Sequence, residues 1–262
     1  MGAGPAALAG AAASPTALQH GRVAGGSTMM DAANLMHGKV CLMTGATSGI
    51  GMVTAQALAQ QGATTIIIAR NPARRTATVN RMKQEAGNPQ VEMMFADLSA
   101  QADIRRLARE FQHRYPRLDV LVNNAGALFP RPEVSPEGIE LTLALNHLAY
   151  FLLTHLPLDT LRASAPARIV NVSSDAHCHA HMPFDDLQGR RRYRGCGAYA
   201  QSKLANVLFT YELARRLDGT GITANAVHPG FVATNFGRHH RGLAGLILRV
   251  LQWCICESSM RI

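Results

Sequence analysis

Lysine and acidic side chains are scarce in this 262-residue sequence, and their scarcity is uneven. Only 3 of the 26 basic residues are lysines, and no Asp or Glu occurs between residues 51 and 84. The net charge of +9 favours anionic partners such as nucleic acid, acidic lipid or a phosphorylated cofactor, although a general preference for arginine explains it equally well. Apolar residues make up 47% of the chain and charged residues 16%, which argues against wholesale disorder.

Paired cysteines and long apolar runs are also missing. The five cysteines are an odd number without framework spacing, so we expect reduced thiols and a cytoplasmic protein. No apolar run reaches the ~18 residues that cross a bilayer. The longest run, residues 243–256, is interrupted by Arg249. It is expected to form a packed helix, and contact with a membrane surface or an apolar pocket stays open.

Residues 1–37 are rich in Ala and Gly and are expected to form a disordered leader. The leader has no basic start and no clean apolar stretch, which argues against a secretory signal. No acidic residue precedes Asp31, so an organelle-targeting peptide stays open. Residues 38–262 are expected to form a single nucleotide-binding domain, because no linker or internal repeat divides them.

From residue 39 onward, short apolar runs alternate with segments of helical spacing. The strand-like runs are residues 39–43, 64–69, 91–96, 118–122, 168–172 and 222–227. The helical segments are residues 52–61, 72–86, 101–114, 138–161 and 199–217. Continuous apolar strands joined by helices predict an α/β fold in which a parallel sheet is covered by helices on both faces.

The segment TGATSGIG, residues 44–51, lies where the first predicted strand meets the first helix. Glycines let the backbone turn sharply and approach a pyrophosphate closely. The free N–H groups and the dipole at the start of a helix then stabilise the anion. We therefore predict a dinucleotide-binding turn made by Gly45, Thr47, Ser48, Gly49, Ile50 and Gly51.

The residue that ends the second strand indicates which dinucleotide binds. A carboxylate there binds the ribose 2′-hydroxyl of NAD, whereas an arginine suits the 2′-phosphate of NADP. This sequence has Arg70 at that position, followed by Arg74 and Arg75, of which at least one is expected to be a solvated charge. NADP(H) is therefore the predicted cofactor. Asp97, followed by Leu98 after the third strand, either hydrogen-bonds the adenine or caps the next helix.

Tyr199 and Lys203 lie four residues apart, on one face of a predicted helix. A nearby ammonium favours phenolate and so lowers the pKa of the tyrosine. Such a tyrosine can exchange a proton with a carbonyl or alcohol oxygen while a hydride moves elsewhere. Ser174 follows the fifth strand, at the edge where open α/β sheets bind ligands, and its hydroxyl could hold the substrate oxygen. A turn or cap serine is the alternative.

Two further clusters draw attention, and neither predicts a site. Residues 177–181 read His-Cys-His-Ala-His, but a loop of this kind rarely brings four ligands to one ion, so a pocket wall rather than a metal site is expected. Residues 190–194 are a basic run with one aromatic. A solvated loop and no nucleic-acid partner are expected, because no groove-entering motif accompanies the run; contact with RNA or anionic lipid is the alternative.

Several motifs together resemble the short-chain dehydrogenase/reductase family: TGATSGIG, NNAG (residues 123–126), YAQSK (residues 199–203) and PGFVAT (residues 229–234). The resemblance covers roughly residues 38–240 and implies a single-domain, three-layer Rossmann fold and NAD(P)-dependent oxidoreduction. It implies that Tyr199 exchanges the proton and that Ser174 orients the substrate oxygen. Lys203 would bind the nicotinamide ribose and tune Tyr199, while Asn146 would hold a relay water. Further cofactor contacts are implied at Asn123, Ala125, Gly126, Pro229, Gly230 and Thr234.

Three segments resemble the retinol dehydrogenase-like branch of that family: residues 145–154, 183–187 and 202–217. The branch typically uses NADP(H) on retinoids or other lipophilic alcohols and aldehydes, so a small lipophilic substrate is implied. A homodimer and peripheral membrane contact stay open.

The family normally continues with a substrate-covering segment, another helix and a seventh strand. Here residues 235–262 leave room for one apolar helix, over residues 242–256, so the last strand is expected to be missing. A catalytically impaired, truncated relative that only binds nucleotide or a partner is the alternative to an enzyme.

Overall fold

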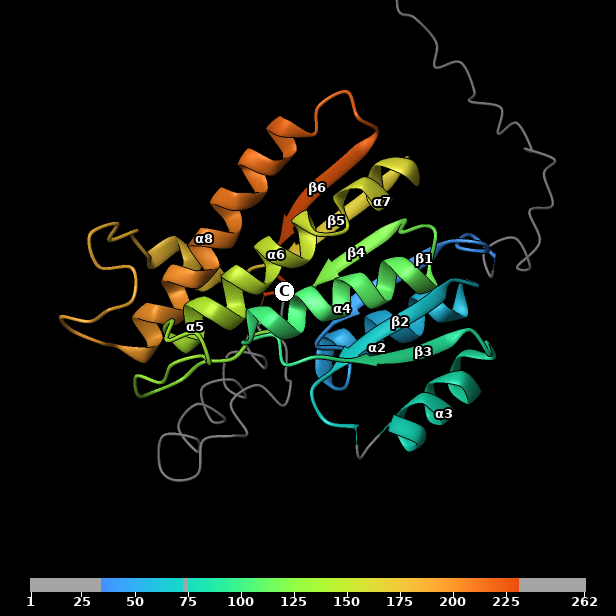
Figure 1. The fold of residues 1–262 in the computed structure, drawn as a ribbon, viewed down its shortest axis with the longest axis horizontal. Coiled ribbons are helices and arrows are strands. Elements are labelled where there is room, and N and C mark those ends of the chain that lie inside the picture. The colour runs from blue at the N-terminus through green and yellow to red at the C-terminus, as the bar shows by residue number, and fades with distance from the viewer. Residues whose placement is uncertain (1–33, 73–74, 231–262) are drawn as a thin grey trace, which may run out of the picture.

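The computed structural model describes residues 34–72 and 75–230, and its centre is a six-stranded parallel sheet (Figure 1). The sheet order is β3-β2-β1-β4-β5-β6. The strands are β1 (Val40–Thr44), β2 (Thr64–Ala69), β3 (Val91–Phe95), β4 (Val120–Asn123), β5 (Ala167–Val172) and β6 (Ile222–Val227). The sheet grows outward from β1 in both directions, which confirms the predicted doubly wound Rossmann-type fold.

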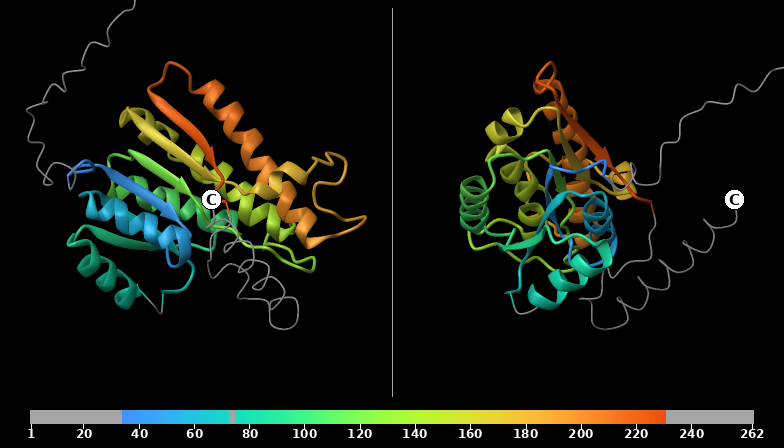
Figure 2. Two further views of the ribbon diagram at one scale, coloured as in Figure 1. Left: turned by 180° about the vertical axis from the view of Figure 1, so that it is seen from behind. Right: turned by 90° about the vertical axis from the view of Figure 1, so that its right-hand side faces the viewer.

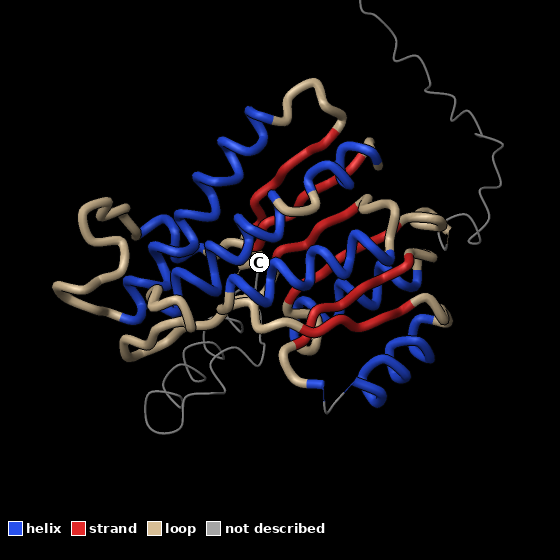
Figure 3. Tube along the Cα trace, in the orientation of Figure 1, coloured by secondary structure: helices blue, strands red, loops and turns tan. Residues whose placement is uncertain are grey.

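Helices cover the two faces of this sheet, as the opposite views of Figures 1 and 2 and the coloured trace of Figure 3 show. One apolar core packs against α4 (Gln101–Arg114), α6 (Ala149–His155) and α8 (Gly195–Arg216). The other packs against α2 (Gly49–Gln60) and α3 (Arg75–Ala86). Shorter elements complete the described chain: α5 (Leu141–Leu143), the π-helix η2 (Ala144–Leu148), α7 (Leu158–Ala163) and the 3₁₀-helix η3 (Asp175–His179).

The central strands β1, β2 and β4 are mostly apolar because each contributes to both cores. In β2, Ile66 and Ile68 belong to the core under α4, α6 and α8, while Ile67 belongs to the core under α2 and α3. Successive strand side chains point to opposite faces, so a sheet covered on both faces needs apolar residues at consecutive positions.

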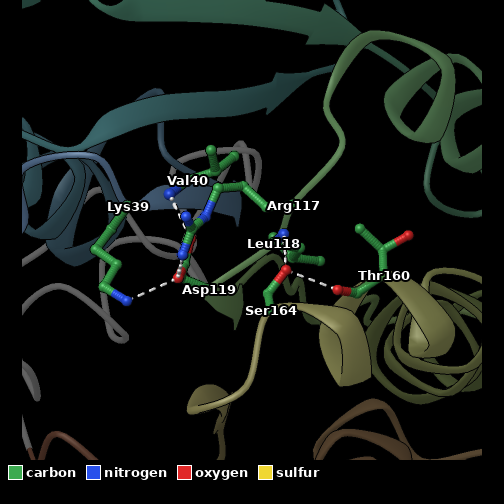
Figure 4. Close-up of polar contacts among 7 residues, drawn as sticks. All are labelled: Lys39, Val40, Arg117, Leu118, Asp119, Thr160 and Ser164. Carbon is green, nitrogen blue, oxygen red and sulfur yellow. Dashed lines mark hydrogen bonds and ion pairs between the residues drawn. The ribbon is translucent and has the colours of Figure 1, made fainter.

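A buried carboxylate joins the starts of β1 and β4 (Figure 4). Asp119 accepts hydrogen bonds from the backbone N–H of Val40 at 2.9 Å, from Lys39 at 3.0 Å and from Arg117 at 2.6 Å. Burial alone would raise the pKa of Asp119, but these three donors together hold it below its ordinary value. The cluster lies at the end of the sheet opposite the carboxyl ends of the strands.

The helical segment expected over residues 138–161 is divided into several elements. Gly138 has φ +73° and stays in a turn, and the side chain of Glu140 caps the first helical residues. Pro157 separates α6 from α7, because proline cannot donate the backbone hydrogen bond that a continuous helix requires. The α8 helix starts at Gly195 rather than at residue 199. The prediction missed its first turn because those residues are small and show no apolar period.

The remaining expectations about the ends lie largely outside the described residues. Residues 34–38 of the expected leader region form turns, with the Met36 N–H bonded to the Gln61 carbonyl at 2.9 Å. Residues 1–33, Arg74, Thr234 and the apolar run at 243–256 are outside the described part, as is any strand after β6.

Candidate functional site

The glycine-rich turn at the carboxyl end of β1 lies beside the NNAG turn at the end of β4. Gly45 has φ +65°, and a Cβ there would lie 2.8 Å from the Cα of Ala125. A Cβ at Gly51 would lie 2.3 Å from the carbonyl oxygen of Gly45. Only glycine fits these two positions, so the close packing of the two turns depends on them.

The other predicted residues of this turn surround the start of α2. Gly49 has φ +58° and opens the helix, and Ile50 is half-buried. Thr47 and Ser48 are exposed, and Ser48 makes no side-chain hydrogen bond to the helix start. Both residues are therefore at the surface, between the carboxyl end of β1 and the start of α2.

Hydrogen bonds fasten the two turns into one unit. Thr44 Oγ1 accepts from the N–H groups of Asn124 at 2.9 Å and Ala125 at 3.0 Å. Asn124 Nδ2 in turn donates to the carbonyls of Thr44 at 3.0 Å and Gly45 at 3.1 Å. This unit lies at the point where the strand order reverses, which is where open α/β sheets bind ligands.

Arg70 and Asp97 lie at the ends of the neighbouring strands β2 and β3, whose last residues pair in register. Arg70 is exposed. Asp97 Oδ1 accepts from the N–H of Ser99 at 2.9 Å and from its hydroxyl at 2.7 Å. The N-cap of α4 is Ala100, so the alternative that Asp97 caps this helix directly is wrong, and Asp97 instead closes the turn before it. The neighbouring Leu98 is buried in the core.

Three other predicted residues lie at or just beyond the carboxyl ends of β4 and β6. Asn123 is fully buried and donates to Thr154 Oγ1 at 3.2 Å and Asn171 Oδ1 at 2.8 Å, so it joins β4 to α6 and β5. Pro229 and Gly230 are exposed at the end of the described chain, after β6.

Ser174, Tyr199 and Lys203 come together where β5 meets α8. The hydroxyls of Ser174 and Tyr199 are hydrogen-bonded to each other. Lys203 is 3% exposed, and its Nζ donates to the backbone carbonyl of Val172 at 3.0 Å. The same Nζ lies 5.6 Å from the centre of the Tyr199 ring. Ser174 Oγ also accepts from the N–H of Ala176, so the cap-serine alternative describes part of its role.

Burial governs the protonation of this group. It lowers the pKa of Lys203 to about 8 and raises the pKa of Tyr199, which the hydrogen bond to Ser174 only partly offsets. The lowered tyrosine pKa expected from the Tyr–Lys spacing is therefore wrong for this structure. The expectation failed because spacing along a helix gives no measure of how deeply a phenol is buried.

Asn146 completes the cluster from η2. Its Oδ1 accepts from the N–H of Ala127 and its Nδ2 donates to the carbonyl of the same residue, both at 2.9 Å. A Cβ on Gly126 would lie 3.4 Å from both Asn146 Oδ1 and Lys203 Nζ. The bare backbone of Gly126 is thus the surface that Asn146 and Lys203 share.

Comparison with known proteins identifies the family. The sequence matches the family model described as short chain dehydrogenase over residues 39–242. The chain belongs to the short-chain dehydrogenase family. Human retinol dehydrogenase 12 is 46% identical over 202 residues, which is 77% of this chain and 64% of that protein. Mouse retinol dehydrogenase 14 is 43% identical over 238 residues, which is 86% of this chain and 71% of that protein. Within the family, this chain therefore belongs to the retinol dehydrogenase-like branch.

Solved structures of short-chain dehydrogenases share the fold. An NADP complex of Pseudomonas aeruginosa RhlG has a TM-score of 0.66 at 32% identity, covering 80% of this chain and 79% of that one. A short chain dehydrogenase from Escherichia coli CFT073, complexed with NADPH, has a TM-score of 0.61 at 30% identity over 76% of this chain and 79% of that one. The match spans less than two thirds of human retinol dehydrogenase 12.

Two residues of this short-chain dehydrogenase were missed by sequence reasoning. Tyr150 is buried, donates to the carbonyl of Ala125 at 2.9 Å, and lies with its ring centre 5.7 Å from Lys203 Nζ. Asn206 is fully buried beside Asn146. Each is a polar residue within an apolar helical segment, which is the one signal that could have drawn attention to them.

The His/Cys segment and the basic loop, for which no site was predicted, lie within the described residues. Among these residues, no group of His, Cys, Asp or Glu could hold a metal ion, and no helix is long and apolar enough to cross a membrane. In the basic loop, Arg191 pairs with Asp185 at 2.5 Å. A cavity of about 490 Å³ lies between this loop and α8, and neither Ser174 nor Tyr199 lines it.

Proposed function

We propose that this chain is an NADP(H)-dependent oxidoreductase that transfers hydride between nicotinamide and a lipophilic alcohol, aldehyde or ketone. The observation that carries the proposal is the hydrogen bond between Tyr199 and Ser174 beside the buried ammonium of Lys203. This group lies at the same edge of the sheet as the glycine turn, so a proton-transfer group and a dinucleotide cradle adjoin each other.

The residues present fit a dinucleotide. Gly45 and Gly51 let the turn pack tightly against Asn124 and Ala125, and the start of α2 beside them would offer its free backbone N–H groups to the pyrophosphate. Arg70 is exposed beyond β2 and supplies a guanidinium for a 2′-phosphate. Asp97 lies on the adenine side, and Lys203 would hold the nicotinamide ribose. When bound, the cofactor supplies or accepts the hydride.

The protein's own part in the reaction is to hold and move one proton. In the direction of reduction, Ser174 would hold the substrate oxygen while the Tyr199 phenol donates its proton to that oxygen. The ammonium of Lys203 would stabilise the phenolate that remains on Tyr199. Asn146 would hold the water through which the proton is restored. The raised pKa of Tyr199 keeps the phenol protonated near neutral pH, which suits its use as the acid.

The substrate class rests on the relatives. Human retinol dehydrogenase 12 and mouse retinol dehydrogenase 14, two relatives of this chain, are named for retinol, which is a lipophilic alcohol. We therefore expect an apolar substrate of that kind and a cytoplasmic location, with a membrane-peripheral or organellar location as the alternative.

The direct test is cofactor consumption by the purified full chain. NADPH mixed with the protein and a panel of lipophilic aldehydes and ketones, retinal among them, is expected to be oxidised only when both protein and carbonyl are present. NADPH binding without turnover on any carbonyl or alcohol would favour the alternative of a nucleotide-binding protein. Failure to bind either NADPH or NADH would contradict both.

A further inference from the structure

Asn206 connects the π-helix to α8 through hydrogen bonds at both ends of its amide. It is 0% exposed and follows Lys203 by one helical turn. Its Nδ2 donates to the backbone carbonyl of Asn146 at 2.8 Å. Its Oδ1 lies 2.9 Å from Nδ1 of His147. Because an amide oxygen can only accept, His147 must donate from Nδ1.

The π-helix that carries Asn146 depends on such contacts. In η2 the Ala149 N–H bonds to the Ala144 carbonyl, five residues back, and π-helical turns of this kind are rare and are often found at functional sites. Two residues of α8 hold this turn at Asn146. Ser202 Oγ accepts from the Asn146 side chain at 3.0 Å, and Asn206 donates to its backbone carbonyl.

We propose that Asn206 is a positioning residue of the reaction, acting by fixing η2 so that Asn146 and Lys203 meet at Gly126. The proposal rests on the proposed function. Asn206 is hydrogen-bonded to the Asn146 carbonyl and to His147, so its effect on the reaction passes through η2. Without the hydrogen bond from Asn206 to the Asn146 carbonyl, η2 could shift. The Asn146 side chain, which is hydrogen-bonded to the backbone of Ala127, would then move with it.

The backbone of Asn206 is also linked to the sheet, through hydrogen bonds that do not involve its side chain. Its own carbonyl accepts from Thr210 Oγ1 at 2.6 Å, and Asn171 Nδ2 on β5 donates to the same Thr210 oxygen at 2.9 Å. Thr210 is buried as well, so Thr210→Val removes a buried polar contact from the same helix without touching Asn146. It is therefore the matched control for a merely structural effect.

Asn206→Asp is the informative variant because the two side chains have nearly the same shape. A carboxylate at this position can still accept from His147, but it cannot donate to the Asn146 carbonyl. A protonated carboxyl can donate there again. Among the titratable groups, His147 on η2 contacts this position, and Lys203 lies one helical turn before it on α8.

The experiment compares wild type, Asn206→Asp and Thr210→Val as full-length folded proteins saturated with NADPH. We expect kcat of Asn206→Asp to fall ~10-fold to ~100-fold at alkaline pH, with KM for NADPH little changed, because a displaced group near the chemistry costs about this much. The ratio of its kcat to that of wild type should recover as the pH falls and the carboxyl protonates. Thr210→Val should lose stability and keep kcat within ~2-fold.

Equal losses of kcat in the two variants, or a variant-to-wild-type ratio that does not change with pH, would overturn the inference. Hydrogen exchange of residues 141–155 provides a readout that needs no turnover. Asn206→Asp should exchange faster there than both wild type and Thr210→Val, and equal exchange would overturn the inference. If wild type itself turns over no carbonyl, the proposed function fails, and the exchange result still decides whether Asn206 fixes η2.

Discussion

The ammonium of Lys203 lies 5.6 Å from the centre of the Tyr199 ring, one helical turn away on α8, and donates its hydrogen bond to the Val172 carbonyl. Burial shifts the two pKa values in opposite directions, downward to about 8 for the lysine and upward for the tyrosine. A buried charge thus stands next to a phenol that keeps its proton at neutral pH. The buried charge of Lys203 would assist the reaction, but it lowers the stability of the fold.

Lys203→Met is therefore expected to stabilise the fold at pH 7. With the pKa lowered from 10.5 to about 8, keeping Lys203 charged costs about 3 kcal/mol, of which its hydrogen bond returns roughly 1 kcal/mol. Between these two pKa values the unfolded chain binds more protons than the folded one, so the free energy of unfolding of wild type should rise from pH 8 to 10.5. The difference in stability between Lys203→Met and wild type should therefore shrink over this range. Urea unfolding across this pH range measures it, with Lys83→Met as the control. A variant less stable than wild type at pH 7 would contradict this account.

Arg70→Gln should change which cofactor binds. Removing the guanidinium is expected to weaken NADPH binding by roughly tenfold to a hundredfold, because a charge-assisted pair with the 2′-phosphate is lost. NADH has no 2′-phosphate, so its affinity should stay the same. Titration calorimetry with both cofactors measures this, and Arg109→Gln on the exposed side of α4 is the control. If both cofactors weaken equally, Arg70 does not read the 2′-phosphate.

Gly51→Ala should abolish NADPH binding. The added Cβ would lie 2.3 Å from the Gly45 carbonyl oxygen, so the turn that receives the pyrophosphate has to move. Gly197 is also the third residue of a helix, but a Cβ there meets only the Cβ of Arg194 at 3.5 Å. Gly197→Ala is therefore expected to leave binding intact. Normal NADPH affinity in a folded Gly51→Ala protein would show that the turn is not the phosphate site.

Asp119→Asn should destabilise the protein without altering the chemistry. Asp119 is 2% exposed and paired with Lys39 and Arg117, which are themselves partly exposed, so a loss of about 2 kcal/mol is expected at pH 7. Since the folded pKa is lowered, this stability is present above the unfolded value of about 4 and is lost as the pH falls through the folded value. Urea unfolding at several pH values checks this. The exposed Asp159→Asn should change little, and a difference that persists at strongly acidic pH would contradict the assignment.

The sequence predicted well where local pattern and packing agree. The strand over residues 64–69 and the helix over residues 101–114 have the predicted bounds, because the first is buried on both faces and the second has a strong apolar stripe. The glycine turn follows β1 and Ser174 follows β5, and they lie at one sheet edge because parallel strands end together there. Tyr199 and Lys203 reach this edge from α8.

What the sequence could not give depends on contacts between distant segments. The change from α- to π-helix at residues 144–148 is accompanied by hydrogen bonds from α8, which lies some 60 residues further along the chain. The roles of Tyr150 and Asn206 arise in the same way, because each contacts a segment that no local pattern connects to it. Burial depth, which decides the protonation of Tyr199, also emerges only in the folded chain.

The central claim is that Tyr199 moves the proton, and Tyr199→Phe tests it most directly. The substitution removes one hydroxyl and keeps the ring beside Lys203. NADPH-dependent turnover of a lipophilic aldehyde is expected to fall ~100-fold to ~10,000-fold, while NADPH affinity stays near the wild-type value. A folded Tyr199→Phe protein that turns over the aldehyde at the wild-type rate would contradict the account.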